Sequence, residues 1–306
     1  MASLRAPLVL GALTAAAGLG YALSEAHAYT LRRVTVPVLA PGERALRVLH
    51  LSDLHLTPTQ DAKIAWVRSL ADLEPDLVVD TGDNMAHTEA LPALLHALEP
   101  LMELPGAFVM GSNDYVAPRP KNPARYLLPD ARLPDRPEET LLPAAELGAA
   151  LRESGWRDLT NRRDGVVADG RRISLVGVDD PHLDLDRFPE PDGKPEVDLH
   201  LGVAHAPYRR VLDRMHDDGA RLVLAGHTHG GQLCVPGWGA LVTNCDLDTR
   251  RAKGLHGWPG SRPDQPGGDE STWLHVSAGL GTSPYAPVRF ACRPEATLLT
   301  LVARLT

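Results

Sequence analysis

The chain has 306 residues, of which 43% are apolar and 23% are charged, so it is long enough to bury the core of one large domain. Its formal net charge of −8 argues against a nucleic-acid-binding face, and we expect no nucleic-acid partner. Three cysteines without a C-x-x-C spacing exclude a zinc knuckle and a redox motif. We expect buried thiols, with at most one internal disulfide.

Residues 7–23 form a nearly uncharged run, preceded by Arg5 and followed by Glu25. The run has the minimum length for a bilayer-spanning helix, and its many Ala and Gly residues make it only moderately apolar. Ala26-His27-Ala28 also fits a cleavage site, so a removed signal peptide and a soluble amphipathic start are the alternatives. We predict an uncleaved single-pass anchor within residues 1–28. This places the protein at the cell membrane, on a side that the flanking charges do not decide, whereas cleavage would make it secreted.

The domain that we expect over residues 29–306 opens with an alternating edge strand at 29–38 and continues in β–α units. Apolar runs at 45–51, 77–79 and 107–110 predict strands. Helical spacing at 61–73 and 88–103 separates these runs. Right-handed crossovers bring the carboxyl ends of such strands to one sheet edge, where α/β sheets place ligands. The runs end in the polar segments Ser52-Asp53-Leu54-His55, Gly82-Asp83 and Gly111-Ser112-Asn113-Asp114.

The amino-acid composition changes at residues 116–143, which contain seven prolines and five basic residues. A loop of this length exceeds what a simple connection needs, so we predict an insertion that serves as a lid or as a mobile excursion. Its basic side chains would meet an anionic substrate or lipid headgroups.

The second half resumes with a helix at 143–155, a hairpin around 166–178 and a strand at 197–204 that ends in His205. A helix at 208–218 and a strand at 221–225 follow, and two last strands are expected at 273–278 and 296–303. The strand at 221–225 runs into Gly226-His227-Thr228-His229-Gly230-Gly231. On extended backbone, residues two apart share a side, so we predict that His227 and His229 point the same way.

Six polar residues therefore follow apolar strands: Asp53, His55, Asp83, His205, His227 and His229. Carboxylate oxygen and imidazole nitrogen suit Mn, Fe and Zn, and the absence of thiolates argues against a structural zinc site. Six such ligands exceed what one ion with an open position needs. We predict two ions that share a bridging aspartate, roughly 3.5–4 Å apart, a geometry used for phosphoryl chemistry.

The ordered motifs resemble those of the calcineurin-like metallophosphoesterases: D-x-H at 53–55, G-D at 82–83, G-x-x-D at 111–114, His205 and G-H-x-H at 226–229. The longer forms S-D-L-H-L, A-H-A-P and G-H-T-H-G-G-Q are similar to the membrane-associated bacterial branch. That branch includes phosphodiesterases similar to UDP-2,3-diacylglucosamine pyrophosphatases. The resemblance implies an α/β protein with the four-layer metallophosphoesterase fold, a central β-sandwich flanked by helices.

The resemblance also implies a mechanism in which a metal-bridging hydroxide attacks the phosphorus of a phosphodiester or pyrophosphate. The cofactors would be two divalent ions (Mn, Fe or Zn), and the substrate a phosphate ester, either lipid-linked or a nucleotide. The resemblance distributes the six side chains over the two ions: Asp53, His55 and His229 on one, His205 and His227 on the other, and Asp83 bridging both.

The third motif departs from the family pattern G-N-H-D, in which Asn is a ligand and His lies near the leaving group. Without a gap Ser112 takes the ligand position, whereas a local shift makes Asn113 the ligand; we keep both as metal candidates. Asn113 and Asp114 are the candidate catalytic residues. Asn cannot donate a proton as an acid does, so we hypothesise a preference for good leaving groups. The alternative function is a catalytically impaired metal-binding scaffold.

Overall fold

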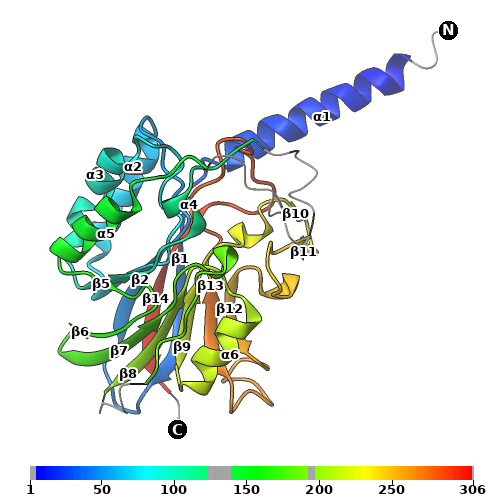
Figure 1. Ribbon diagram of the computed structural model, residues 1–306. Helices are drawn as coiled ribbons and strands as arrows, with labels where there is room; N and C mark the ends of the chain where they lie inside the picture. The colour runs from blue at the N-terminus through cyan, green and yellow to red at the C-terminus, as the bar shows by residue number, and fades with distance from the viewer. Residues whose placement is uncertain (1–4, 121, 123–127, 129–138, 192–196, 305–306) are drawn as a thin grey trace.

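Two six-stranded sheets form the centre of the protein in the computed structural model, which describes residues 5–120, 122, 128, 139–191 and 197–304 (Figure 1). The first sheet has the order β1 (Thr30–Leu39), β14 (Glu295–Ala303), β2 (Leu46–Leu51), β3 (Leu77–Asp80), β4 (Gly106–Phe108) and β5 (Arg157–Asp158). The second has the order β12 (Gly254–Trp258), β13 (Thr272–Val276), β9 (Leu222–Ala225), β8 (Leu199–Ala204), β7 (Arg171–Gly177) and β6 (Arg163–Ala168).

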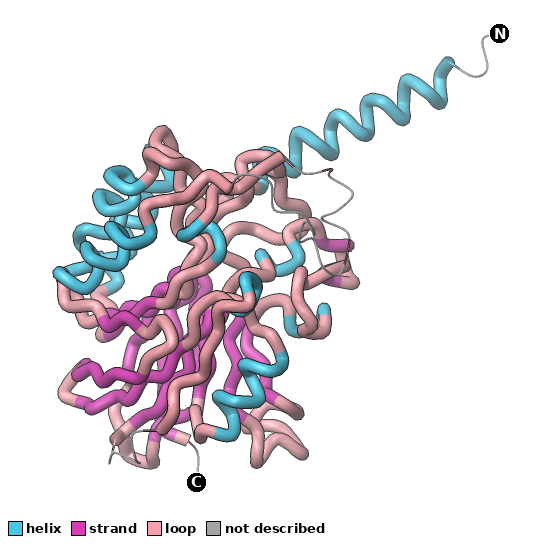
Figure 2. The backbone as a smooth tube through the Cα atoms, viewed as in Figure 1, coloured by secondary structure: helices cyan, strands magenta, loops and turns pink. Residues whose placement is uncertain are grey.

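Helices cover the outer face of each sheet, so the fold has four layers (Figure 2). On the first sheet lie α2 (Asp61–Arg68) with the 3-10 turn η1 (Ser69–Leu73), α3 (Leu91–Met102) and α5 (Ala144–Glu153). On the second lies α6 (Arg209–Asp217), which packs Val211, Leu212 and Met215 onto the sheet. The predicted β-sandwich flanked by helices is confirmed.

Between the sheets lies a core of Val, Leu and Ile side chains, because strands of both sheets present every second residue inward. Leu46 and Val48 of β2 face Leu201 of β8 and Leu224 of β9 within this cluster. Elsewhere Cys234 and Cys292 are buried free thiols and Cys245 is a partly buried one, as expected.

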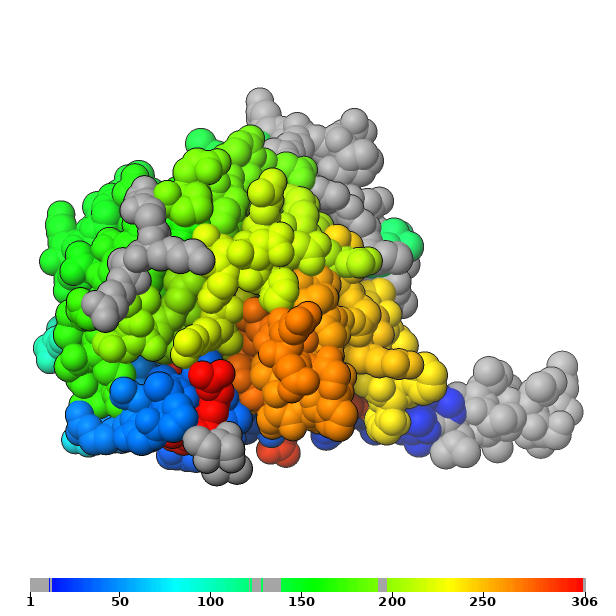
Figure 3. Space-filling model, turned by 90° about the horizontal axis from the view of Figure 1, so that it is seen from below, coloured from blue at the N-terminus to red at the C-terminus, as the bar shows by residue number. Residues whose placement is uncertain are grey.

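The strand directions bring one end of each sheet to the same place. In the first sheet β2, β3 and β4 are parallel neighbours, and in the second β7, β8 and β9 are. The predicted edge strand is β1, which pairs in parallel with β14; the two lie side by side on the face shown in Figure 3. The predicted hairpin is the antiparallel pair β6–β7.

The short elements are the ones that the sequence pattern misses. Strands of two residues carry no periodicity, so β5, β10 (Cys234–Val235) and β11 (Gly239–Ala240) had no signal. The same holds for α4 (Ser112–Tyr115) and for the 3-10 turns η3 (Pro181–Leu183), η4 (His229–Gly231) and η5 (Thr249–Arg251). Strand β12 contains two glycines, which weaken a strand signal.

The N-terminal residues form one helix, α1 (Arg5–Glu25), which projects from the body of the protein (Figure 1). Its C-terminal end is attached to the body: the ring of Tyr21 packs edge-on against Phe290 at 5.4 Å, and Glu25 accepts a hydrogen bond of 2.8 Å from the backbone of Ala291. Among the residues that the structure describes, no helix is both long and apolar enough to cross a membrane. The predicted spanning anchor at 7–23 is therefore not supported; side chains 5–10 and 12 lie outside the described residues.

Most of the Pro-rich basic insertion lies outside the described residues, so its role as a lid remains a prediction. Its two ends are held together by backbone hydrogen bonds of 2.9 Å, from Ala117 to Thr140 and from Leu142 to Tyr115. The insertion thus leaves and re-enters the fold at one point, directly after the third motif.

Candidate metal centre

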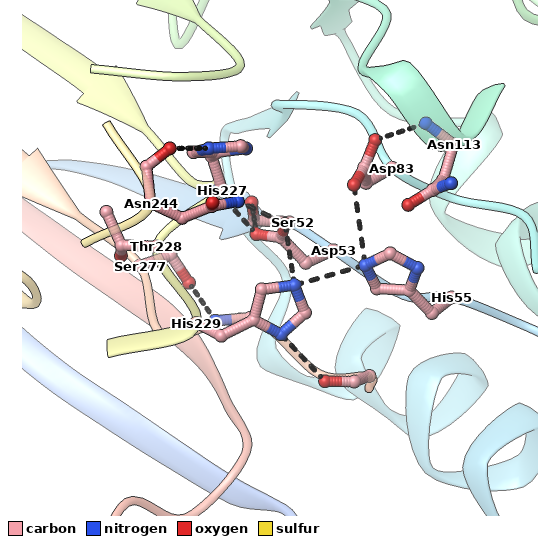
Figure 4. Close-up of polar contacts among 12 residues, drawn as sticks. Ser52, Asp53, His55, Asp83, Asn113, His227, Thr228, His229, Asn244 and Ser277 are labelled. Carbon is pink, nitrogen blue, oxygen red and sulfur yellow. Dashed lines mark hydrogen bonds and ion pairs between the residues drawn. The ribbon is translucent and has the colours of Figure 1, made fainter. Parts of the chain in front are cut away.

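The six predicted ligands converge where β2, β3, β8 and β9 end. Two groups have ligand atoms within 4.8 Å of one another: Asp53 with His55 and His229, and Asp53 with Asp83 and His205. His227 lies beside the second group, with its Nδ1 3.3 Å from Nε2 of His205. Figure 4 shows Asp53, His55, Asp83 and His229 turned toward a common space. The first sheet supplies both carboxylates and one imidazole, and the second sheet supplies the other three imidazoles.

Left-handed backbone, rather than extended backbone, aims these side chains. Asp53, His55, Asp83, His227 and His229 all have positive φ, between 41° and 68°. The prediction that His227 and His229 share a side through strand alternation was therefore wrong in its geometry, because each sits in a tight turn. Non-glycine residues rarely adopt this conformation because it costs free energy, and those that do are found mostly at functional sites.

Two glycines are required by close approach. A Cβ at Gly226 would lie 1.8 Å from Oγ of Ser52 and 2.6 Å from Oδ2 of Asp53. A Cβ at Gly111 would lie 2.4 Å from Oδ1 of Asp83. At Gly226 loops of the two sheets meet, and at Gly111 two loops of the first sheet meet, with no room for a side chain at either point.

Backbone carbonyls fix the orientation of three imidazoles. The pairs are Nδ1 of His205 with the oxygen of Thr81 at 2.8 Å, Nδ1 of His229 with Gly281 at 3.1 Å, and Nε2 of His227 with Asn244 at 3.1 Å. A carbonyl only accepts, so each of these nitrogens carries a proton, and in the neutral ring the opposite nitrogen has the lone pair that a cation can take. For His205 and His229 that nitrogen faces a carboxylate of the cluster. Metal-binding histidines are oriented in this way, so the donor set fits divalent cations.

Asp83 lies between the two groups. Its Oδ2 is 3.4 Å from Nε2 of His55, and its Oδ1 is 3.4 Å from Nε2 of His205. Asp53 is 3.5 Å from Nε2 of His229 through Oδ1, and both of its oxygens accept the backbone N–H of His227, at 3.1 and 3.0 Å. The carboxylates therefore join the loops of both sheets (Figure 4).

Burial dominates the electrostatics of the cluster. It raises the pKa of Asp83 to about 8 and lowers the pKa of His55 and of His229 well below the ordinary value. Burial also opposes charge on His205, but Asp83 and Asp180 outweigh it and raise its pKa to about 9. Carboxylates and imidazoles here compete for protons, and a divalent cation can replace those protons.

The third motif lies against Asp83. The backbone N–H of Asn113 donates to Oδ1 of Asp83 at 2.7 Å, and Oγ of Ser112 is 3.5 Å from the same oxygen. The Asp114 carboxylate is fully buried and accepts three backbone N–H groups, those of Asp83, Asn84 and Gly111, at 2.8–2.9 Å. Ser112 and Asn113 line the cavity at the site, whereas Asp114 faces the backbone.

A cavity of about 450 Å³ opens onto the cluster. His55, Asp83 and His229 line its polar end. Beyond them its wall is mixed: the apolar side chains of Val116, Leu183, Leu233, Val242, Ala286 and Val288 alternate with polar and charged ones, among them Arg119, Glu139, His182 and Gln232.

Arg289 holds the loops around His229. Its fully buried guanidinium donates to the carbonyls of Ala278 and Gly281, both at 2.7 Å, and more weakly to that of His229 at 3.3 Å. Sequence reasoning missed this residue because a single arginine in a loop carries no motif. It also missed Thr81, Asn244 and Gly281, since a backbone carbonyl leaves no trace in the sequence.

A profile described as calcineurin-like phosphoesterase matches residues 46–231, more than half of the chain. The chain belongs to this family. The match spans the loops of all six candidate ligands, which confirms the resemblance of the motifs.

Relatives of this phosphoesterase are similar over nearly their whole length. Metallophosphoesterase YkuE of Bacillus subtilis is 27% identical, covering 96% of this chain and 93% of the relative. Phosphodiesterase YaeI of Escherichia coli is 28% identical, covering 84% and 82%. UDP-2,3-diacylglucosamine pyrophosphatase LpxG of Chlamydia trachomatis is 26% identical, covering 83% of each. The protein is thus a metal-dependent phosphohydrolase, as predicted.

Proposed function

We propose that this phosphoesterase hydrolyses a phosphodiester or pyrophosphate bond at a pair of divalent cations. Asp53, His55 and His229 would hold the first cation, His205 and His227 would hold the second, and Asp83 would be shared by both. The position of Asp83 carries the proposal, because one of its oxygens faces His55 and the other faces His205, each at 3.4 Å. A carboxylate with an imidazole on either side is well placed to be a ligand of two cations at once.

When bound, divalent cations lower the pKa of water and stabilise negative charge on phosphoryl oxygens. The chain itself supplies orientation. The carbonyls of Thr81, Gly281 and Asn244 each accept the N–H of one ring nitrogen, so that the other nitrogen of each imidazole is directed into the cluster. We assign Asp114 a positioning role, since its carboxylate holds the turn of Asp83 through backbone N–H groups.

Of the two candidates in the third motif, Asn113 is better placed as a further ligand. Its side-chain Nδ2 donates to the carbonyl of Val116 at 2.9 Å, and its oxygen is turned toward Asp83 and His55 in Figure 4. An amide that positions itself in this way offers no acid to the leaving group. We infer a preference for substrates whose leaving group departs without a proton.

Asn113→His tests that preference with an aryl and an alkyl phosphodiester. We expect the variant to hydrolyse the alkyl ester faster and the aryl ester at nearly the same rate, because only the alkoxide leaving group needs protonation. Equal changes on both substrates contradict it.

The cavity supports a substrate with an apolar organic group, a lipid-linked phosphoester among them, over a nucleotide. Apolar side chains such as Val116, Leu183 and Val288 line part of the cavity beyond the ligands, beside polar ones such as Arg119 and Gln232, and apolar lining favours apolar groups. Comparing kcat/KM for phosphodiesters with short and long alkyl chains tests this, and a preference for nucleotides contradicts it.

The reaction itself is tested by hydrolysis of an aryl phosphodiester with added Mn²⁺, together with metal content per chain. Two ions per chain and activity that disappears in folded Asp83→Ala are expected. One ion per chain contradicts the dinuclear arrangement. Bound ions without activity under Mn, Fe or Zn favour the alternative, a metal-binding scaffold with the altered third motif.

A further inference from the structure

A chain of polar side chains crosses the largely aliphatic interior of the sandwich. It begins at His275 on the inner face of β13 and passes to His50 on the inner face of β2. All its members are fully buried, with at most 1% of their surface exposed. The contacts are Nδ1 of His275 with Nδ1 of His50 at 2.9 Å, Nε2 of His50 with Oγ1 of Thr81 at 3.0 Å, Thr81 with Oγ of Ser52 at 2.7 Å, and Ser52 with Oδ2 of Asp53 at 2.5 Å.

Donor and acceptor chemistry gives this chain one direction. The Asp53 carboxylate only accepts, so the Ser52 hydroxyl donates to it and accepts from Thr81. The Thr81 oxygen then accepts the N–H at Nε2 of His50. Burial lowers the pKa of His50 well below its ordinary value and that of His275 to about 3, so both rings are neutral. His50 thus has a lone pair at Nδ1, and His275 donates to it from Nδ1.

Thr81 links this chain to the second group of ligands. Its hydroxyl belongs to the chain that ends at Asp53, while its backbone carbonyl accepts the N–H of His205 at 2.8 Å. Thr81 therefore contacts His205 of the second group directly, and it contacts Asp53 through Ser52. Buried polar groups are costly unless every member is paired, and here the pairing runs to the site.

We propose that Thr81 is a positioning residue, through which His50 and His275 orient the Asp53 carboxylate toward a bound cation. The inference rests on the proposed metal centre. Neither imidazole touches the ligands directly, so each acts only through the hydroxyl groups of Thr81 and Ser52. The two sheets are thereby tied to the site from inside the core.

The test compares Thr81→Val with Thr81→Ser in the full-length protein. Valine matches the shape of threonine without the hydroxyl, serine keeps the hydroxyl, and both retain the carbonyl that holds His205. Loss of a ligand's hydrogen-bond partner weakens metal binding about 10–100-fold. Thr81 bonds to Ser52, the partner of Asp53, rather than to Asp53 itself, so we expect the Mn²⁺ dissociation constant to rise by about 10-fold, the lower end of that range, in Thr81→Val. The Co²⁺ absorption spectrum should change, and Thr81→Ser should resemble the wild type. Wild-type affinity and spectrum in folded Thr81→Val overturn the proposal.

The far end of the chain is tested with a second matched pair at His275. Asparagine places an amide N–H near the position of Nδ1, whereas leucine offers no donor. We expect weaker Mn²⁺ binding in His275→Leu than in His275→Asn, with a smaller difference than at Thr81. Equal affinities of the pair overturn the part assigned to His275.

A measurement on the wild type tests the proposal even if the variants fail to fold. Nitrogen-15 NMR of the imidazoles should show His50 protonated at Nε2 and His275 at Nδ1, and the opposite tautomers overturn the proposed direction. A wild type that binds no Mn²⁺ or Co²⁺ would refute the proposed function instead, while the tautomers still test the chain.

Discussion

The interior of the sandwich and its ligand-bearing end are built from the same strands by opposite rules. In the interior, regular strands present Val, Leu and Ile side chains in low-energy backbone. One step beyond the strand ends, five candidate ligands adopt left-handed backbone, and buried carboxylates meet imidazoles. Packing in the interior stabilises the fold, whereas the ligand-bearing end destabilises it, because strained backbone and buried charge both cost free energy. Away from the polar chain that runs from His275 to Asp53, stability and chemistry should therefore be separable by mutation.

The largest expected effect comes from His229→Gly, which removes a ligand and its strained backbone together. Phosphodiester hydrolysis should fall by more than the roughly 100-fold that loss of a ligand's partner costs. Metal-free His229→Gly should be more stable than metal-free His229→Ala by about 1 kcal/mol. Alanine retains the free-energy cost of left-handed backbone at φ +48°, whereas glycine does not. Urea unfolding in EDTA measures this difference, and a less stable glycine variant would contradict the role of strain.

Leu201→Ala should show the reverse pattern. Leu201 is fully buried between the sheets, and truncating such a residue costs about 2–5 kcal/mol of unfolding free energy. Activity per folded molecule should stay near that of the wild type, as measured at a temperature where both proteins are folded. A large loss of activity without unfolding would mean that interior and site are coupled at this position.

Metal removal should lower stability without removing the fold. Cations that bind only the native state add about 2.7 kcal/mol at 100 times their dissociation constant. We expect EDTA to lower the thermal midpoint while circular dichroism at 20 °C keeps its strand signal. Complete unfolding on chelation would show that the interior cannot sustain the sandwich.

Asp218→Asn should have the smallest effect on activity, because it lies far from the ligands, and its effect should be on stability alone. Arg163 donates to both oxygens of this carboxylate, at 2.8 and 2.6 Å, and His200 contacts it at 2.9 Å. Burial opposes its charge, but these hydrogen bonds outweigh burial and lower its pKa below 3.8. The variant should lose about 1–3 kcal/mol at neutral pH.

A lowered pKa fixes the pH dependence of that loss. The contribution of Asp218 is complete above its unfolded pKa of about 3.8 and is lost as the pH falls through the lower folded value. Wild type and Asp218→Asn should therefore converge in urea midpoint only below about pH 4. A difference that stays constant from pH 7 to pH 3 would contradict this assignment.

The sequence predicted what regular spacing and residue chemistry encode. Short apolar runs located β2, β3 and β9, a further strand pattern located β8, and ligand types after each strand located the six side chains. It could not predict how Asp53 or His229 is aimed, because left-handed turns depend on contacts between the two sheets. Carbonyl partners such as that of Thr81 were equally invisible, since every residue has a carbonyl.

The end of α1 gives the N-terminal segment a structural role in the finished enzyme. The backbone N–H of Arg289 donates to the carbonyl of Ala22 at 3.0 Å, and Glu25 holds Ala291. A truncated enzyme that starts at residue 29 would lose both tethers on the segment from which Arg289 reaches the His229 loop. Such a shortened protein should release its cations more readily than one that starts at residue 18, even though both keep every ligand.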